Sequence, residues 1–202
     1  MFVENVELFH FNNNVRRNDI WQVGNEIDNT ENYFSDYYNG ALHFAANVPT
    51  TKNEMCHFSE IIDDYLTREQ DTETYIKMLE TASVFLKHYT SVQREMVLEL
   101  VRKELFPYIP SRKNCIWLCD ERQLEFWKEK LGNSADLFKV SVTGELFKTS
   151  DIFLPDKEMN IIESYERAKE YWNPDFSKID ESKTEYLFQG KLKILKKLDK
   201  IN

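Results

Sequence analysis

The chain has 202 residues, of which 35 are acidic and 26 basic, so its formal net charge is −9. This excess of negative charge argues against a general nucleic-acid binder and against a polybasic membrane binder, which carry the opposite sign. Hydrophobic residues make up 42% of the chain, enough for a packed core. The 5 glycines form neither G-x-G-x-x-G nor G-x-x-x-x-G-K-[ST], which excludes the common dinucleotide-binding and phosphate-binding loops.

The sequence also predicts a reducing, cytoplasmic location. No stretch approaches the ~18 consecutive apolar residues of a membrane span, and the first residues lack the apolar core of a secretory signal. The three cysteines, Cys56, Cys115 and Cys119, are too few for a disulfide framework. Cys115 and Cys119 lack the turn residues and further ligands of a zinc site, so we expect no bound metal.

The N-terminal quarter predicts short strands and an irregular region. Residues 6–11 (VELFHF) form an apolar, aromatic run typical of a first strand, and Gly24 is a turn signal within residues 21–28. Residues 29–50 are rich in Asn, Tyr and Phe without clean periodicity, so we expect irregular structure there.

The middle of the chain, residues 51–106, predicts helices. Thr51 and Glu54 have the spacing of a capping box before an apolar run. Further on, apolar residues recur every three or four positions in two groups, which predict an antiparallel helical pair joined at residues 89–91. The apolar residues that we expect to be buried in this pair are Tyr75, Leu79, Leu86, Leu100 and Leu105.

After the helices, the apolar pattern changes. Residues 115–119 (CIWLC) form a short apolar run typical of a buried strand. Asp120 and Gln123 then fit a capping box for a helix that ends at Gly132.

The last third of the chain alternates between strand and helix patterns. Residues 137–148 predict a strand pair or one strand bent at Gly144, and a helix follows near residues 157–172. The alternation over residues 185–195 predicts a final strand. Its apolar row lies on one face, which leaves Glu185 on the other face.

The order of these elements predicts the fold class. Helices in the middle and strands at both ends predict a single α+β domain over residues 1–202, with the helical segment 51–106 inside it. Because strands and helices do not alternate regularly, an antiparallel-rich sheet fits better than a doubly wound parallel sheet.

Three residues on the predicted strands are candidates for chemistry: His10, Trp117 and Glu185. Taken singly, each has an ordinary structural role, as a half-buried histidine, a core tryptophan and a solvated glutamate. Their order along the chain, however, resembles the H-Y-E branch of the ADP-ribosyltransferase superfamily, which includes the poly-ADP-ribose polymerases and diphtheria-type toxins. The runs that carry this resemblance are Leu8–Asn12, Gln22–Ile27, Cys115–Asp120 with Trp127, and Thr184–Phe188.

The chain also resembles a bacterial family known as domain of unknown function 2441. The similar runs are PSR-x2-CIWLCD at residues 110–120, AK-x-YW at residues 168–172 and E-x-L-F-x-G at residues 185–190. Together the two resemblances span nearly the whole chain and imply an ADP-ribosyltransferase-like fold, with two packed antiparallel-rich sheets around a cleft.

The resemblance implies an NAD-dependent ADP-ribosyltransferase of bacterial or phage type with an unknown acceptor. Glu185 would be the carboxylate that stabilises an oxocarbenium-like ribose, and His10 would act with it by binding the adenine-side ribose. Trp117 or Trp127 would stack on the cationic nicotinamide, and Arg112 would pair with the pyrophosphate. NAD would therefore be held by His10, Phe11, Trp117, Trp127 and Arg112.

Two departures from the motifs leave other functions open. Phe11 and Asn12 stand where the branch has small or hydroxyl residues, and Trp117 stands where it has tyrosine. A second interpretation is therefore a non-catalytic nucleotide-binding or protein-interaction module with the same fold. A third is an unrelated function, such as recognition of a nucleotide or an RNA end by a defence-system component.

Overall fold

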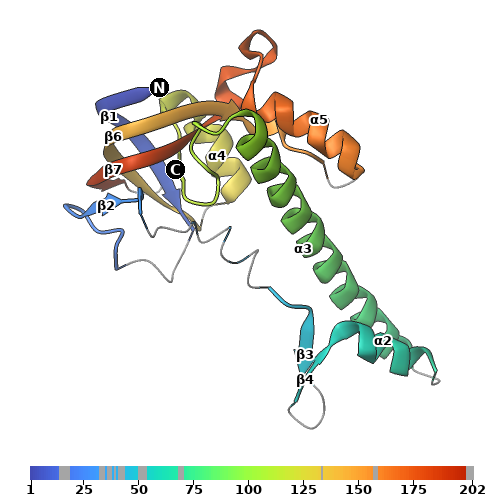
Figure 1. Ribbon diagram of the computed structural model, residues 1–202. Helices are drawn as coiled ribbons and strands as arrows, with labels where there is room; N and C mark the ends of the chain where they lie inside the picture. Colours follow the sequence, from blue (N-terminus) through green and yellow to red (C-terminus); the bar gives the residue numbers. More distant parts are fainter. Residues whose placement is uncertain are drawn as a thin grey trace. The chain divides into compact units, whose positions relative to one another are not determined.

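The structure is a computed structural model that shows an α+β fold with antiparallel sheets, as the sequence predicts (Figure 1). It describes residues 1–13, 19–31, 35, 38, 40, 44–49, 54–67, 71–132, 134–156 and 159–198. The chain divides into a larger unit, Met1–Asn39 with Arg94–Asn202, and a smaller unit, Gly40–Gln93. Each unit is described by itself. No helix within the described ranges is long and apolar enough to cross a membrane.

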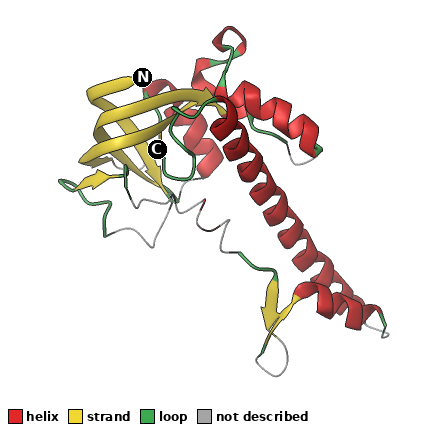
Figure 2. Cartoon of the chain, viewed as in Figure 1, coloured by secondary structure: helices red, strands yellow, loops and turns green. Residues whose placement is uncertain are grey.

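The larger unit is built on a five-stranded sheet in which β1, β6, β7 and β2 follow one another and β5 also pairs with β7 (Figure 2). Every one of these pairings is antiparallel. The strands are β1 (Phe2–Asn12), β2 (Glu26–Asp28), β5 (Ile116–Leu118), β6 (Asp136–Ser150) and β7 (Thr184–Leu198). The predicted first, middle and last strands are therefore confirmed, and β6 is one continuous strand rather than a strand pair.

The sheet of the larger unit returns to its first strand. Phe9 in β1 and Cys119, directly after β5, exchange two backbone hydrogen bonds of 2.9 Å. Because β1 pairs with β6, β6 with β7 and β7 with β5, these four strands form a ring. The bridge at Phe9 covers part of the edge that β1 would otherwise present.

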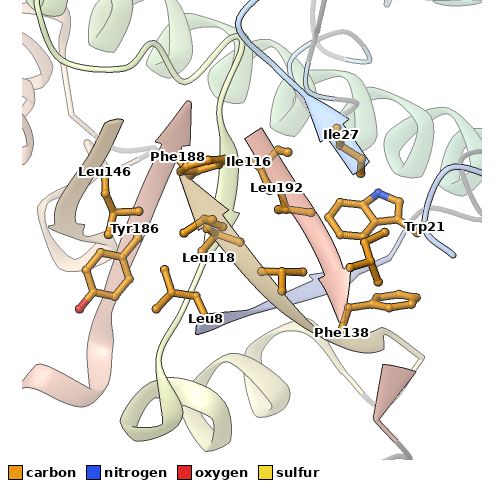
Figure 3. Close-up of a cluster of buried hydrophobic side chains, with 13 residues drawn as sticks. Leu8, Trp21, Ile27, Ile116, Leu118, Phe138, Leu146, Tyr186, Phe188 and Leu192 are labelled. Carbon is orange, nitrogen blue, oxygen red and sulfur yellow. The ribbon is translucent and has the colours of Figure 1, made fainter. Parts of the chain in front are cut away.

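Alternating side chains of β7 belong to two different apolar clusters. Phe188, Leu192 and Ile194 of β7 belong to the core drawn in Figure 3, whereas Leu187 belongs to a second cluster that contains Trp172. Successive side chains of a strand point to opposite faces of its sheet, so these clusters lie on the two faces of β7. The predicted apolar row of the last strand is confirmed.

Helix α4 (Leu124–Leu131) is bounded as the sequence predicts. In the 3-10 turn before it, Asp120 and Gln123 form the expected capping box. Gly132 follows the helix with a φ of +79°, and its amide donates to the Lys128 carbonyl, as is typical of a glycine that ends a helix.

Helix α5 (Ile161–Trp172) begins a few residues later than the expected start near residue 157. Asn160 and Glu163 form its capping box, which the sequence analysis did not identify, and residues 157–158 lie outside the described residues. At its end, the Trp172 indole donates a buried hydrogen bond of 2.8 Å to the Leu98 carbonyl. This bond fixes the last turn of α5 on the C-terminal part of α3.

Helix α3 (Thr72–Leu105) is one continuous helix of 34 residues, so the predicted helical pair is wrong. At the expected turn, the hydroxyls of Thr90 and Ser91 donate to the Lys87 carbonyl at 3.0 and 2.9 Å. Hydroxyls that bond back to the preceding turn are satisfied within a helix, and no glycine or proline interrupts it. The predicted burial is also wrong, because the exposed fractions are 41% for Tyr75, 70% for Leu79, 66% for Leu86, 49% for Leu100 and 47% for Leu105.

The described part of the smaller unit includes a hairpin, the short helix after it and the first part of α3. Strands β3 (Asn47–Pro49) and β4 (Met55–His57) pair antiparallel, and α2 (Phe58–Leu66) follows directly. Phe58 of α2 packs edge-on against Phe85 of α3, with 4.9 Å between ring centroids. This aromatic contact joins the two helices of the unit.

The start of α2 differs from the predicted capping box. His57 caps the helix, because its Nδ1 accepts a hydrogen bond of 3.3 Å from the Ser59 amide. Glu54 precedes β4, and Thr51 lies outside the described residues. A histidine ring accepting at Nδ1 can replace the usual Ser, Thr, Asp or Asn cap.

The fold depends on two glycines that lie opposite each other in β6 and β7. A Cβ on Gly144 would lie 2.4 Å from the Gln189 carbonyl oxygen and 2.7 Å from the Gly190 Cα, and its φ is +154°. We expect Gly144→Ala to lower the free energy of unfolding by roughly 2–5 kcal/mol, from crowding plus backbone strain. Urea unfolding followed by tryptophan fluorescence measures this loss.

Gly132→Ala is the matched control. Gly132 also has a positive φ, but a Cβ there would have no neighbour within 4 Å, so we expect a loss of only about 1–2 kcal/mol. Equal losses in the two variants would contradict the close approach of β6 and β7.

Candidate functional site

The strands that carry the three candidate residues are neighbours in the larger unit. Trp117 of β5 lies opposite Leu187 of β7, and the segment after β5 pairs with β1, which carries His10. Trp117 and Glu185 share one face of the sheet, because Glu185 is two residues from Leu187. The tertiary structure thus brings together strands from three distant parts of the chain.

His10 lies on the opposite face from Trp117 and Glu185. Its ring stacks on Trp21, with 4.0 Å between centroids and an interplanar angle of 13°, and Trp21 belongs to the core in Figure 3. Phe11, the next residue of β1, packs with Phe9 on the other side. His10 and Phe11 therefore contact different clusters.

Arg112 is the centre of a buried ionic cluster, which we call the Arg112 cluster: Glu95, Arg112, Tyr171 and Glu185. The guanidinium donates hydrogen bonds of 2.8 and 3.2 Å to the Glu95 carboxylate and lies 3.5 Å from Oε1 of Glu185. It also donates to the Tyr171 hydroxyl, which in turn donates to Glu185 at 2.7 Å. All four residues are at least 95% buried, whereas the ordinary role expected of Glu185 from the sequence was that of a solvated glutamate.

Four separate segments supply the Arg112 cluster. Glu95 comes from the buried face of α3, Arg112 from the loop before β5, Tyr171 from the last turn of α5, and Glu185 from the start of β7. The Arg112 guanidinium also lies 5.1 Å from the centre of the Tyr171 ring. The cluster therefore ties α3 and α5 to the sheet.

Electrostatics and burial fix the protonation of Arg112 and Tyr171 in the Arg112 cluster. Burial lowers the pKa of the Arg112 guanidinium, but Glu95, Tyr171 and Glu185 together outweigh burial and raise that pKa well above its usual value. Burial raises the pKa of the Tyr171 hydroxyl well above its usual range. Arg112 thus stays charged and Tyr171 stays a hydrogen-bond donor at every ordinary pH.

Both candidate stacking tryptophans lie beside cations of the protein itself. The Arg112 guanidinium is 5.3 Å from the centre of the half-buried Trp117 ring. Lys130 lies 5.0 Å from the centre of the Trp127 ring, and the Trp127 indole donates to the Thr184 carbonyl at 2.9 Å. Each contact has the geometry of a cation–π interaction, so a nicotinamide ring would meet these rings beside a like charge.

His10 is held as a neutral ring. Its Nδ1 lies 2.9 Å from the Trp117 carbonyl oxygen, which can only accept, so Nδ1 carries the proton. Burial lowers the pKa of His10 to about 4, against the opposing effect of that hydrogen bond. His10 therefore links β1 to β5 and carries no charge near neutral pH.

A groove of about 340 Å³ lies beside His10, because Trp21 forms part of its wall. Its other lining residues are Gln22, Val23, Asp136, Phe138 and Lys197. Lys197 forms an ion pair of 2.7 Å with Asp136, and its ammonium lies 5.7 Å from the centre of the Phe138 ring. The groove thus combines two largely buried aromatic side chains with the exposed cation of Lys197.

The buried cysteines are not suited to nucleophilic chemistry. Burial raises the pKa of the Cys115 thiol well above its usual range and that of Cys119 to about 12, so both stay protonated. Both belong to apolar clusters. Within the described ranges, His, Cys, Asp and Glu side chains do not gather in a group of three or more that could hold a metal ion.

Sequence reasoning missed two members of the Arg112 cluster. Glu95 is three residues before Leu98 and six before Val101, both fully buried, so it interrupts the apolar face of α3. A charged residue at an apolar helix position was the available signal. Tyr171 carried no such signal in the sequence, because a tyrosine beside Trp172 fits an apolar helix face equally well.

A comparison with protein families found a match. A family model described as "Protein of unknown function (DUF2441)" matches residues 8–200, nearly the full length of the chain. A search of curated proteins found no match. The three runs that resemble this family supply Arg112, Tyr171 and Glu185, three of the four residues in the Arg112 cluster.

The Arg112 cluster predicts a large effect of a single substitution. Arg112→Ala removes the cation from between two buried carboxylates, and we expect the free energy of unfolding to fall by roughly 3–5 kcal/mol. Urea unfolding measures this change. Arg122→Ala is the control, since Arg122 pairs with Asp120 at the surface and its loss should change little. A similar small change in both variants would contradict the role of Arg112.

His10 predicts a pH dependence of stability. An unfolded histidine, with a pKa near 6.5, binds a proton that the folded His10 does not take up until about pH 4. Stability should therefore be complete above pH 6.5 and fall between pH 6.5 and 4, by on the order of 1–3 kcal/mol. His10→Asn keeps a donor for the Trp117 carbonyl but cannot titrate, so its profile should be flatter in urea unfolding at pH 7.5, 6 and 5.

His57→Asn is the matched control for this pH profile. His57 is an exposed helix cap, and asparagine is an equally good cap, so this variant removes a histidine while leaving the buried His10 ring in place. A wild-type slope that survives in His10→Asn would assign the pH dependence to other groups.

Proposed function

The chain belongs to the DUF2441 family of proteins of unknown function, and we propose that it is a nucleotide-binding module with an ADP-ribosyltransferase-like fold that does not transfer ADP-ribose. One observation carries the proposal: Glu185 is buried and bound by Tyr171 and Arg112. A transferase needs this carboxylate at the ribose, where positive charge develops.

The surroundings of Glu185 oppose its use in catalysis. Arg112 already balances part of the negative charge that would stabilise an oxocarbenium-like ribose. Moving Glu185 toward a substrate would also separate a buried carboxylate from its hydrogen-bond donor and its cation, which costs several kcal/mol. The carboxylate therefore serves the fold of the larger unit.

The groove beside His10 supports nucleotide binding. Trp21 and Phe138 line it, and Lys197 lies at its surface. Both rings are at least 95% buried, so they offer a ligand apolar contact and no open face for stacking. A phosphate can replace Asp136 as the partner of Lys197. A volume near 340 Å³ falls within the range of small-molecule sites. We propose that the groove binds an adenine nucleotide such as NAD.

The competing function is NAD-dependent ADP-ribosyl transfer. It is favoured by the placement of His10, Trp117 and Glu185 on neighbouring strands. For this reaction Glu185 would have to leave the Arg112 cluster when NAD binds. The two functions differ in one measurable product, free nicotinamide.

Titration with NAD tests the proposal. Calorimetry should show binding heat, and mass spectrometry should show no nicotinamide release. Val23→Glu places a negative charge in the groove and should weaken binding at least tenfold. Val84→Glu is its matched control, because both valines are 59% exposed and Val84 lies on α3, so this variant should bind NAD as the wild type does. No heat, or equal binding by both variants, would overturn the groove assignment.

Glu185→Gln separates the proposed from the competing function. In the proposed function it lowers stability and leaves the heat of NAD binding unchanged. Nicotinamide release by the wild type that falls by roughly 10²–10³ in Glu185→Gln would instead establish a transferase. Glu4→Gln, an exposed strand glutamate in β1, should alter neither quantity.

A further inference from the structure

Helix α3 carries a stripe of outward-facing residues spaced alternately four and three positions apart. Six of them lie in the smaller unit, and the sixth, Gln93, is its last residue. The same spacing continues along the helix after Gln93. The stripe consists of Tyr75, Leu79, Ala82, Leu86, Tyr89, Gln93, Met96 and Leu100.

The large side chains of the stripe are exposed. Leu79 is 70% exposed, Leu86 66% and Met96 60%. The buried residues of α3, such as Leu98 and Val101, have different positions in the repeat. An apolar strip of this extent exceeds the scattered apolar residues that are normal on a monomer surface.

The spacing of the stripe is that of a coiled coil. An apolar repeat of 3.5 residues keeps one seam facing a partner helix as the two helices supercoil, whereas the natural period of a straight helix is 3.6. Packing of α3 within one chain does not need this repeat over 26 residues. We propose that α3 forms a coiled coil with α3 of a second copy of this chain.

Charge favours a second copy as the partner. The chain carries a net charge of −9, but within Thr72–Leu105 five acidic residues are balanced by five basic ones. Two copies of this helix therefore meet without the repulsion that the remaining surfaces would impose. The flanking positions Met78, Phe85 and Val92 are apolar, so along these three positions the border of the stripe carries no charge that would select an oppositely charged partner. The next position of this row, Glu99, pairs with Arg102 of the same helix.

The length of the stripe and its single polar position fit such a dimer. The stripe spans 26 residues of α3, which is about 39 Å at 1.5 Å per residue. Gln93 is the polar member of the stripe, and one polar residue at a core position fixes the register of paired helices. The proposal is independent of nucleotide binding, which uses the groove in the larger unit.

Sedimentation velocity at several concentrations tests the dimer. The wild type should sediment as a dimer in the micromolar range, and Leu86→Lys should raise its dissociation constant at least tenfold. Val84→Lys lies on the same helix two residues away, is similarly exposed and is outside the stripe, so it should remain dimeric. A wild-type monomer at 100 µM, a roughly 100-fold excess over a micromolar dissociation constant, would overturn the proposal.

Folding of the variants is checked by far-UV circular dichroism and by the melting transition. Leu79→Lys provides a second disruption of the stripe at another exposed position if Leu86→Lys does not fold. A folded lysine variant that stays as dimeric as Val84→Lys would also overturn the proposal, since the dimer would then use another surface.

Discussion

The Arg112 guanidinium compensates two carboxylates that are removed from water where α3, α5 and β7 meet. Glu95 and Glu185 are at least 95% buried, and each would destabilise the larger unit by several kcal/mol without its cation. Tyr171 completes the arrangement by donating to Glu185. Since the four residues come from separate segments, the cluster forms only when these segments are all in place. It therefore specifies how the helices of the larger unit dock on its sheet.

The two faces of β7 have different roles, and the Arg112 cluster lies on one of them. On one face, Glu185 holds the larger unit together. On the other, Trp21 connects His10 with a groove of about 340 Å³. A carboxylate that neutralises a buried guanidinium is poorly placed to stabilise a second positive charge. The proposed ligand site therefore lies in the groove and not at Glu185.

The strands were predictable because their two faces differ. In β7, Phe188, Leu192 and Ile194 alternate with polar residues, so the sequence pattern records the burial of one face. The single long helix α3 was not predictable in the same way. Its apolar spacing indicates that one face of the helix is to be covered, but the spacing does not indicate which element or partner covers that face. The spacing that suggested burial within the chain belongs to an exposed stripe, for which we propose a second copy as partner.

The sequence by itself determined the α+β class, the main strands, the caps of α4 and the choice of Arg112 and Glu185 as notable residues. These are local properties, set by alternation, capping chemistry and residue type. Only the tertiary structure decided that Arg112 and Glu185 pair, because they are 73 residues apart and no short-range pattern records which charges are buried together. Burial changes the chemistry of a charged group more than the residues next to that group in the sequence do. Which charged groups are buried is decided by packing.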